Sequence, residues 1–209
     1  MKALIEHLWR CNREQIVARS LMHCHAWNVH SIMLLECPGK TIRLFVAEPG
    51  HLLAENHPAI VHHCQTVGFH AHHCELTLQP VFGEVFNWTI EKTATGGFTI
   101  PQYRYQSAIT HGAIAFKADG DASFVTKGFD VIPPGEGVFM RASEIHTIVV
   151  RAGQWAAWLA FEGRENPEYD NRLWSYTRPE AQDYSKFYRP MTPSIIRDYL
   201  KLAFRGSNL

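Results

Sequence analysis

The chain has 209 residues, of which 46% are hydrophobic, 12% aromatic and 19% charged, a length that suits one domain with a sizeable core. Twenty Lys and Arg residues balance twenty Asp and Glu residues without a basic run, so neither a nucleic acid nor an anionic membrane surface is an expected partner. No apolar stretch reaches the ~18 residues that a membrane span needs, and the first residues lack the cleavage site of a secretory signal. Composition therefore argues against a nucleic-acid-binding protein, a membrane protein and a disordered tail.

The cysteines and histidines are distributed unevenly. Five cysteines are scattered without a C-x-x-C pair, which is typical of reduced thiols in a cytoplasmic protein and not of a disulfide scaffold or a zinc ribbon. The thirteen histidines are an unusually large number, and most of them fall into three clusters. These clusters are His23, His25 and His30; His51, His57, His62 and His63; and His70, His72 and His73.

Hydrophobic periodicity predicts an N-terminal helix followed by many short strands. Residues 2–20 place apolar side chains at helical spacing. Residues 31–36 and 41–46 are strand-like runs joined by Pro38 and Gly39, which suit a type II turn. Further strands are predicted at 69–78, 81–90, 98–109, 113–117, 123–125, 129–132, 138–141, 147–150 and 155–162, with turns at 96–97, 119–121 and 133–137. So many short strands favour an antiparallel sandwich or barrel.

The C-terminal part is predicted to lie outside this β body. Residues 165–190 are polar and aromatic without a clear period, which favours an arm that wraps over the strands. Thr192 as N-cap and Pro193 at the first helical position then begin a second helix. We therefore expect a single domain that consists of an N-terminal helical segment (1–28), a β-barrel (29–163) and a C-terminal arm and helix (164–209).

A His-x-His pair carries the clearest chemical signal. Side chains alternate faces along a strand, so His70 and His72 are expected to point the same way. Two imidazoles on one strand can occupy adjacent corners of a metal's coordination shell, with a third ligand from elsewhere in the chain. Imidazole suits Fe, Zn, Cu and Ni, and three protein ligands with open positions are typical of a reactive metal site.

The sequence around this pair resembles the first motif of the cupin superfamily. That motif is Gly, five residues, His-x-His, three or four residues, Glu, six residues and Gly. His70, His72 and Gly83 match it with the shorter spacing, whereas Cys64 replaces the leading Gly and Leu76 replaces the Glu. Glu75 lies one residue from the Glu position and on the opposite face of an ideal strand, so only a bulge would make it a ligand.

A second cupin motif follows further along the chain. It consists of Gly, five residues, Pro-x-Gly, two residues, His, three residues and Asn. Gly135 and His146 match it, whereas Arg141, Ser143 and Val150 replace the Pro, the Gly and the Asn. The resemblance covers about residues 30 to 163.

The resemblance implies an all-β cupin jelly-roll barrel, a double-stranded β-helix, with flanking N- and C-terminal helices. It also implies a metal site formed by His70, His72 and His146. A cupin with three histidines and no motif Glu is similar to the non-haem iron dioxygenases of the cysteine dioxygenase and diketone dioxygenase type. Fe(II) is accordingly the expected metal, with Zn, Ni or Mn as other divalent ions, and a small molecule is the expected substrate.

Four further residues are candidates for the pocket. Arg43 lies on the early strand where thiol-dioxygenase relatives keep a carboxylate-binding Arg, and Arg141 is a second candidate anion clamp near the third ligand. Tyr103 and Tyr105 share one face of a predicted strand and could hydrogen-bond a bound oxygen ligand. The alternative for each is a solvent-facing arginine or an aromatic ring that only packs.

Other interpretations of the chain stay open. His23, His25 and His30 with His62 and His63 could form a second metal site, although such histidines usually decorate loops. The protein could be a small-molecule-binding or sensing cupin without turnover. It could also be a metal-independent isomerase or epimerase in which His72 acts as general base. A homodimer through outer strands or the C-terminal arm is a further expectation.

Overall fold

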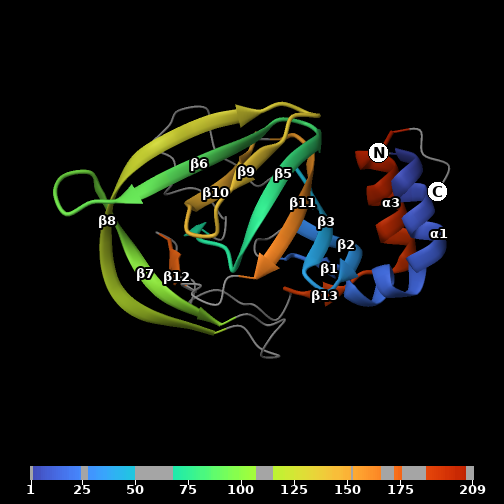
Figure 1. Ribbon diagram of the computed structural model, residues 1–209, viewed down its shortest axis with the longest axis horizontal. Helices are drawn as coiled ribbons and strands as arrows, with labels where there is room; N and C mark the ends of the chain where they lie inside the picture. The colour runs from blue at the N-terminus through green and yellow to red at the C-terminus, as the bar shows by residue number, and fades with distance from the viewer. Residues whose placement is uncertain are drawn as a thin grey trace.

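The computed structural model describes residues 2–24, 28–49, 68–106, 115–151, 153–165, 172–175 and 187–205, and it shows a β-rich body with two helices at one end (Figure 1). The elements in chain order are α1 (Lys2–Arg19), β1 (Leu21–Met22), β2 (Val29–Cys37), β3 (Lys40–Ala47), β4 (Phe69–His70), β5 (Cys74–Phe82), β6 (Val85–Lys92), β7 (Phe98–Gln106), β8 (Ala115–Ile132), β9 (Val138–Met140), β10 (Ile145–Val150), β11 (Ala156–Glu165), β12 (Arg172–Trp174), β13 (Arg189–Pro190) and α3 (Pro193–Ala203). Neither described helix is long and apolar enough to cross a membrane.

The strands form two sheets. One has seven strands in the order β13-β1-β2-β3-β11-β5-β9, and the other closes into a six-stranded barrel in the order β10-β4-β12-β7-β8-β6. Neighbouring strands are antiparallel in both sheets. The predicted all-β barrel with flanking helices is therefore confirmed.

Both predicted helices are present and cover one face of the seven-stranded sheet (Figure 1). Ile5 and Ile16 of α1 join Ile196 and Leu200 of α3 in one buried cluster that includes side chains of β2, β3 and β11. The N-terminus of α3 has the predicted cap, because the Thr192 side chain accepts a hydrogen bond from the backbone N–H of Ile195. The helices therefore seal the side of the sheet that faces away from the barrel.

Two further cores lie on either side of the barrel wall. One cluster joins sheet residues of β3, β5, β9 and β11 to residues of β6, β8 and β10, so it fills the space between the sheet and the barrel. The other takes one or more buried side chains from each of the six barrel strands, and it therefore fills the barrel itself. Its members are Phe69, Trp88, Ile90, Ile100, Phe124, Val149 and Trp174. Because side chains alternate along a strand, β6, β8 and β10 contribute to both cores.

The structure divides two of the predicted strands. The strand predicted at 69–78 is interrupted at residues 71–73, so His72 lies between β4 and β5 and not on a continuous strand. The strand predicted at 81–90 is divided by a turn at Gly83, where a Cβ would collide with the carbonyl oxygen of Trp155. The positive φ at this position favours glycine. In the sequence, the apolar residues on both sides of Gly83 conceal the turn and resemble one continuous strand.

The three short strands predicted between 113 and 132 are one long strand, β8. The predicted turn at 119–121 is wrong. Gly120 has a φ of +82°, and the register against β7 shifts between Pro101 and Tyr103, so the extra residues form a bulge. The same bent strand pairs with β7 along one part and with β6 along another, which lets the barrel close.

The β body also extends beyond residue 163. β12 lies between β4 and β7 and is a strand of the barrel, although the sequence places it in the arm. β13 pairs with β1 at the edge of the other sheet. Most of the remaining predicted arm lies outside the described residues.

We predict that Gly68→Ala destabilises the protein much more than Gly39→Ala. Both glycines have positive φ, which costs an alanine about 1–2 kcal/mol. A Cβ at Gly68 would additionally lie 2.5 Å from the carbonyl oxygen of Trp174, whereas a Cβ at Gly39 has nothing within 4 Å. The clash should add about 1–3 kcal/mol, measurable by urea unfolding of both variants. Equal losses would show that close packing at Gly68 is unimportant.

Candidate metal centre

The strand registers bring two of the three predicted ligands side by side. In the barrel wall, β10 lies between β4 and β6, and His146 is directly opposite both His70 and Thr89. Directly opposed residues of an antiparallel pair point to the same side of the sheet. His70 is in turn opposite Leu173, and Leu173 is opposite Tyr103. The five residues form one row across the wall, on the face opposite the aromatic core of the barrel.

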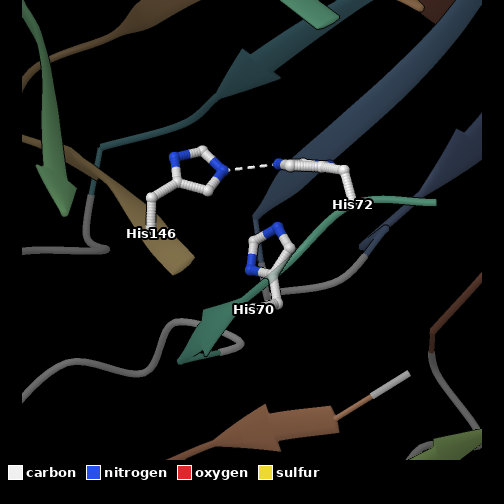
Figure 2. A group of neighbouring side chains, drawn as sticks. All are labelled: His70, His72 and His146. Carbon is white, nitrogen blue, oxygen red and sulfur yellow. Dashed lines mark hydrogen bonds between the residues drawn. The ribbon is translucent and has the colours of Figure 1, made fainter. Parts of the chain in front are cut away.

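The third ligand reaches the same place from the interruption between β4 and β5. The backbone N–H of His72 donates to the carbonyl oxygen of Ala142 at 3.0 Å, which anchors this segment to the loop before β10. The three imidazole rings then point towards one another (Figure 2), with centroids 4.8–5.1 Å apart. One nitrogen from each ring lies within 4.8 Å of the others.

Among the described residues, this is the only group of His, Cys, Asp or Glu side chains with such spacing. The donor set suits a divalent transition metal, since all three ligands are imidazole nitrogens. His72 Nε2 and His146 Nε2 are 2.6 Å apart. Two nitrogens that each lie ~2.0–2.1 Å from one ion would be about 3.0–3.4 Å apart. His72 and His146 would therefore have to separate slightly to hold one ion, whereas the widest of the three separations, up to 4.8 Å, would have to shorten.

The outer nitrogens of two ligands are held by neutral oxygen atoms. His146 Nδ1 lies 2.6 Å from Asn87 Oδ1, and His70 Nδ1 lies 3.2 Å from the carbonyl oxygen of Gly68. A ring that donates from Nδ1 carries its lone pair on Nε2, the nitrogen available to a metal. Asn87 was not among the sequence candidates. Its signal is an isolated amide within the largely apolar strand β6.

Burial favours the neutral, metal-binding form of two of the three ligands. Desolvation lowers the pKa of His146 well below its ordinary value of 6.5, and the neighbouring His70 lowers it further. Desolvation also lowers the pKa of His70, partly opposed by the hydrogen bond to Gly68. Both rings are therefore uncharged at pH 7.

No carboxylate joins the histidines among the described residues. The Glu75 side chain is exposed and is not part of the histidine group, so no bulge makes it a ligand. Leu76, at the position of the motif Glu, is 5% exposed and belongs to the core between the sheet and the barrel. Cys74 is buried.

The remaining pocket candidates differ in position. Tyr103 is 4% exposed and lies in the same cross-strand row as His70 and His146, two strands from His70. The side chain of Tyr105 lies outside the described part of the chain. Arg141 is exposed on the loop between β9 and β10. The roles of all three stay predictions.

Arg43 lies on the sheet face that is turned towards the barrel, as do Phe45 and Ala47 on the same strand. Its Nε is 3.2 Å from Glu162 Oε1, and its terminal NH1 donates to Ser31 Oγ at 3.3 Å. Glu162, another residue that sequence reasoning missed, therefore compensates the charge of this arginine. Because the partner lies more than a hundred residues away, only the β3–β11 register reveals it.

The proposed second histidine site is only partly described. His25, His62 and His63 lie outside the described residues. The backbone N–H of His23 donates to His30 Nδ1 at 3.2 Å, and the backbone N–H of Asn28 donates to His23 Nδ1 at 3.0 Å. His30 also stacks on Tyr199, whose hydroxyl donates to Glu48 Oε1 at 2.6 Å. These contacts link β2, the end of β3 and α3.

Comparison with known proteins gives structural neighbours only. No protein-family model and no curated protein matches the chain. Similar solved structures include hydroxypropylphosphonic acid epoxidase from S. wedmorenis, with 12% identity, coverage of 71% of this chain and 57% of that one, and a TM-score of 0.39. A cupin superfamily protein from Desulfitobacterium hafniense is 12% identical over 66% of this chain and 78% of its own, with a TM-score of 0.36.

A cupin domain from Bordetella pertussis is 9% identical over 66% of this chain and 94% of its own, also with a TM-score of 0.36. Cupins are thus among the solved structures similar to this chain, as the motifs predict. With TM-scores below 0.5, these likenesses carry no argument about activity, and the fold rests on the strand order and registers given above.

We predict that the metal-free protein loses stability as the pH falls below about 6.5. The pKa values of His70 and His146 are lowered in the folded state, so the unfolded chain binds more protons in this range. Stability should fall by up to about 1.4 kcal/mol per pH unit for each histidine until the pH reaches its folded-state pKa.

Urea unfolding between pH 7.5 and 5 measures this dependence. A His146→Gln variant should show a shallower slope, whereas His73→Gln, at the exposed neighbouring position, should keep the slope of the unmodified protein. An unchanged slope in His146→Gln would contradict the assignment of His146 as a buried neutral imidazole.

Proposed function

We propose that His70, His72 and His146 bind one divalent metal, most favourably Fe(II), and that the protein is a dioxygenase-like enzyme that oxidises a small molecule with O₂. The observation that carries this proposal is the convergence of three imidazoles with no carboxylate beside them in the described chain. Imidazole also suits Zn and Ni, and Mn is a further candidate, so the preference for Fe(II) rests on the similarity of a three-histidine site without a motif Glu to the non-haem iron dioxygenases.

The fit of Fe(II) follows from the charge of the donor set. Bound Fe(II) would supply electrons for O₂ reduction and a positive centre that attracts an anionic group of the substrate. His70, His72 and His146 would hold the ion, and its further coordination positions would be available to exogenous ligands. The apolar residues between the sheet and the barrel, Leu76 and Met140 among them, would limit the access of water from that side of the site.

Two pocket residues have roles in this proposal. Tyr103 would contribute a hydroxyl on the same face as the ligands. Arg43 already forms an ion pair with Glu162, so it would have to share or break this ion pair to contact an anionic substrate. It would therefore bind such a substrate more weakly than an unpaired arginine. The cytoplasmic location and the homodimer remain predictions.

A metal-independent isomerase or epimerase is a second candidate. The observation that favours it is the contact between His72 Nε2 and His146 Nε2, which together with Asn87 forms a chain of three hydrogen-bonding side chains. Such a chain can orient His72 as a general base. A binding or sensing barrel without turnover would use the same pocket.

We predict that the protein, purified without a tag under anaerobic conditions, contains about one equivalent of metal that depends on the three histidines. The double variant His70→Ala/His146→Ala should lose this metal, and His73→Ala should retain it because His73 is exposed and outside the group. Plasma mass spectrometry measures the content.

Iron as the bound metal would justify measuring O₂ uptake with small thiols and diketones. Absence of metal in the unmodified protein, even after anaerobic addition of Fe(II), would contradict the dioxygenase proposal. Ligand screening for an isomerase or a binding barrel would then follow.

A further inference from the structure

Asn87 is a buried amide on a strand whose other buried residues are mostly apolar. It lies on β6 two residues before Thr89, on the face of the wall that carries His146. Its side chain is buried, with 4% exposure, and the residues directly opposite it are Ile148 of β10 and the exposed Asp130 of β8. Burying an amide costs free energy unless it is hydrogen-bonded, and an apolar residue of similar size would avoid this cost.

The contact of Asn87 Oδ1 with His146 Nδ1 gives the histidine a definite chemical form. An amide oxygen only accepts, so His146 must donate from Nδ1 and carry a lone pair on Nε2. Without a metal, that lone pair faces His72 Nε2 at 2.6 Å, and His72 must be the donor there. His146 is therefore already in the metal-binding form, whereas His72 must move its proton from Nε2 to Nδ1 when a metal binds.

We propose that Asn87 is the positioning residue of the metal centre, which fixes the tautomer and orientation of His146 while adding no charge. This inference rests on the proposed metal binding. An aspartate at this position would hold the same Nδ1–H but would compensate part of the metal's charge. The amide keeps that charge available to an anionic ligand.

Three variants separate these effects. Asn87→Leu removes the acceptor at similar volume, and Asn87→Asp retains an acceptor oxygen but adds a charge. Thr89→Val is the matched control, because Thr89 is a buried polar residue on the same strand and face whose hydroxyl donates to the Gly128 carbonyl at 3.4 Å and not to a histidine. Thermal unfolding identifies any variant that fails to fold, and Asn87→Asp then provides the second test of the position.

Imidazole ¹⁵N NMR of the metal-free protein tests the tautomer directly. We expect His146 to be Nδ1-protonated in the unmodified protein, in Thr89→Val and in Asn87→Asp, and to be a mixture of tautomers in Asn87→Leu. Nε2 protonation in the unmodified protein would overturn the proposal, since the amide group would then donate through its nitrogen.

Competition titrations with Co²⁺ and Zn²⁺ test the consequence for binding. Asn87→Leu should weaken metal affinity by about 10–100-fold, Asn87→Asp should restore it, and Thr89→Val should leave it unchanged. Azide should bind the Co²⁺ form of Asn87→Asp more weakly than the unmodified Co²⁺ form, as followed by the visible cobalt bands. Unchanged metal affinity in Asn87→Leu would overturn the proposal.

The two measurements distinguish this proposal from the proposed function. If the unmodified protein binds no metal, metal binding fails as a function. The NMR result on metal-free protein still shows whether Asn87 fixes His146. If the protein binds metal but the tautomer does not depend on Asn87, only the positioning role is wrong.

Discussion

The pairing of β10 with β4 on one side and β6 on the other is the constraint on which the candidate site depends. It puts His146 opposite His70 and within reach of Asn87. Side chains alternate with a period of two, so a slip of one residue would turn His146 into the aromatic core of the barrel. Gly68 secures the entry of β4, because its backbone approaches Trp174 too closely for any other residue.

The two cores explain how one buried and two half-buried imidazoles can lie together without destabilising the fold severely. The aromatic core packs against one face of all six barrel strands. The other face of the wall can therefore carry polar groups. His146, Asn87 and Thr89 all use that face, and each has a hydrogen-bond partner. The cost of burying His146 appears as its lowered pKa and not as an unpaired group. The same burial that costs stability at low pH keeps the ring available to a metal at neutral pH.

Local patterns were sufficient to predict the helices, the turn at Gly39 and the three convergent histidines, because capping, turn geometry and motif spacing are written in neighbouring residues. Long-range pairing was not predictable in the same way. The bulge at Gly120 resembles a turn in sequence, and β12 could be assigned to the barrel only through its partners β4 and β7. Asn87 and Glu162 were not predictable for the same reason, since the residues that they contact lie far away in the chain.

The charges around the site favour an anionic ligand over a neutral one. Burial favours the neutral form of His70 and His146, and the oxygens behind them belong to a peptide group and to the Asn87 amide, neither of which carries charge. The ion pair of Arg43 and Glu162, on the opposing sheet, compensates itself. Nothing in this set of residues offsets the two positive charges of a bound divalent ion. In a poorly hydrated site such an imbalance is costly, and a substrate that coordinates through an anionic atom would relieve it. If the three histidines bind a divalent ion as proposed, the donor chemistry of the protein would thus favour an anionic ligand.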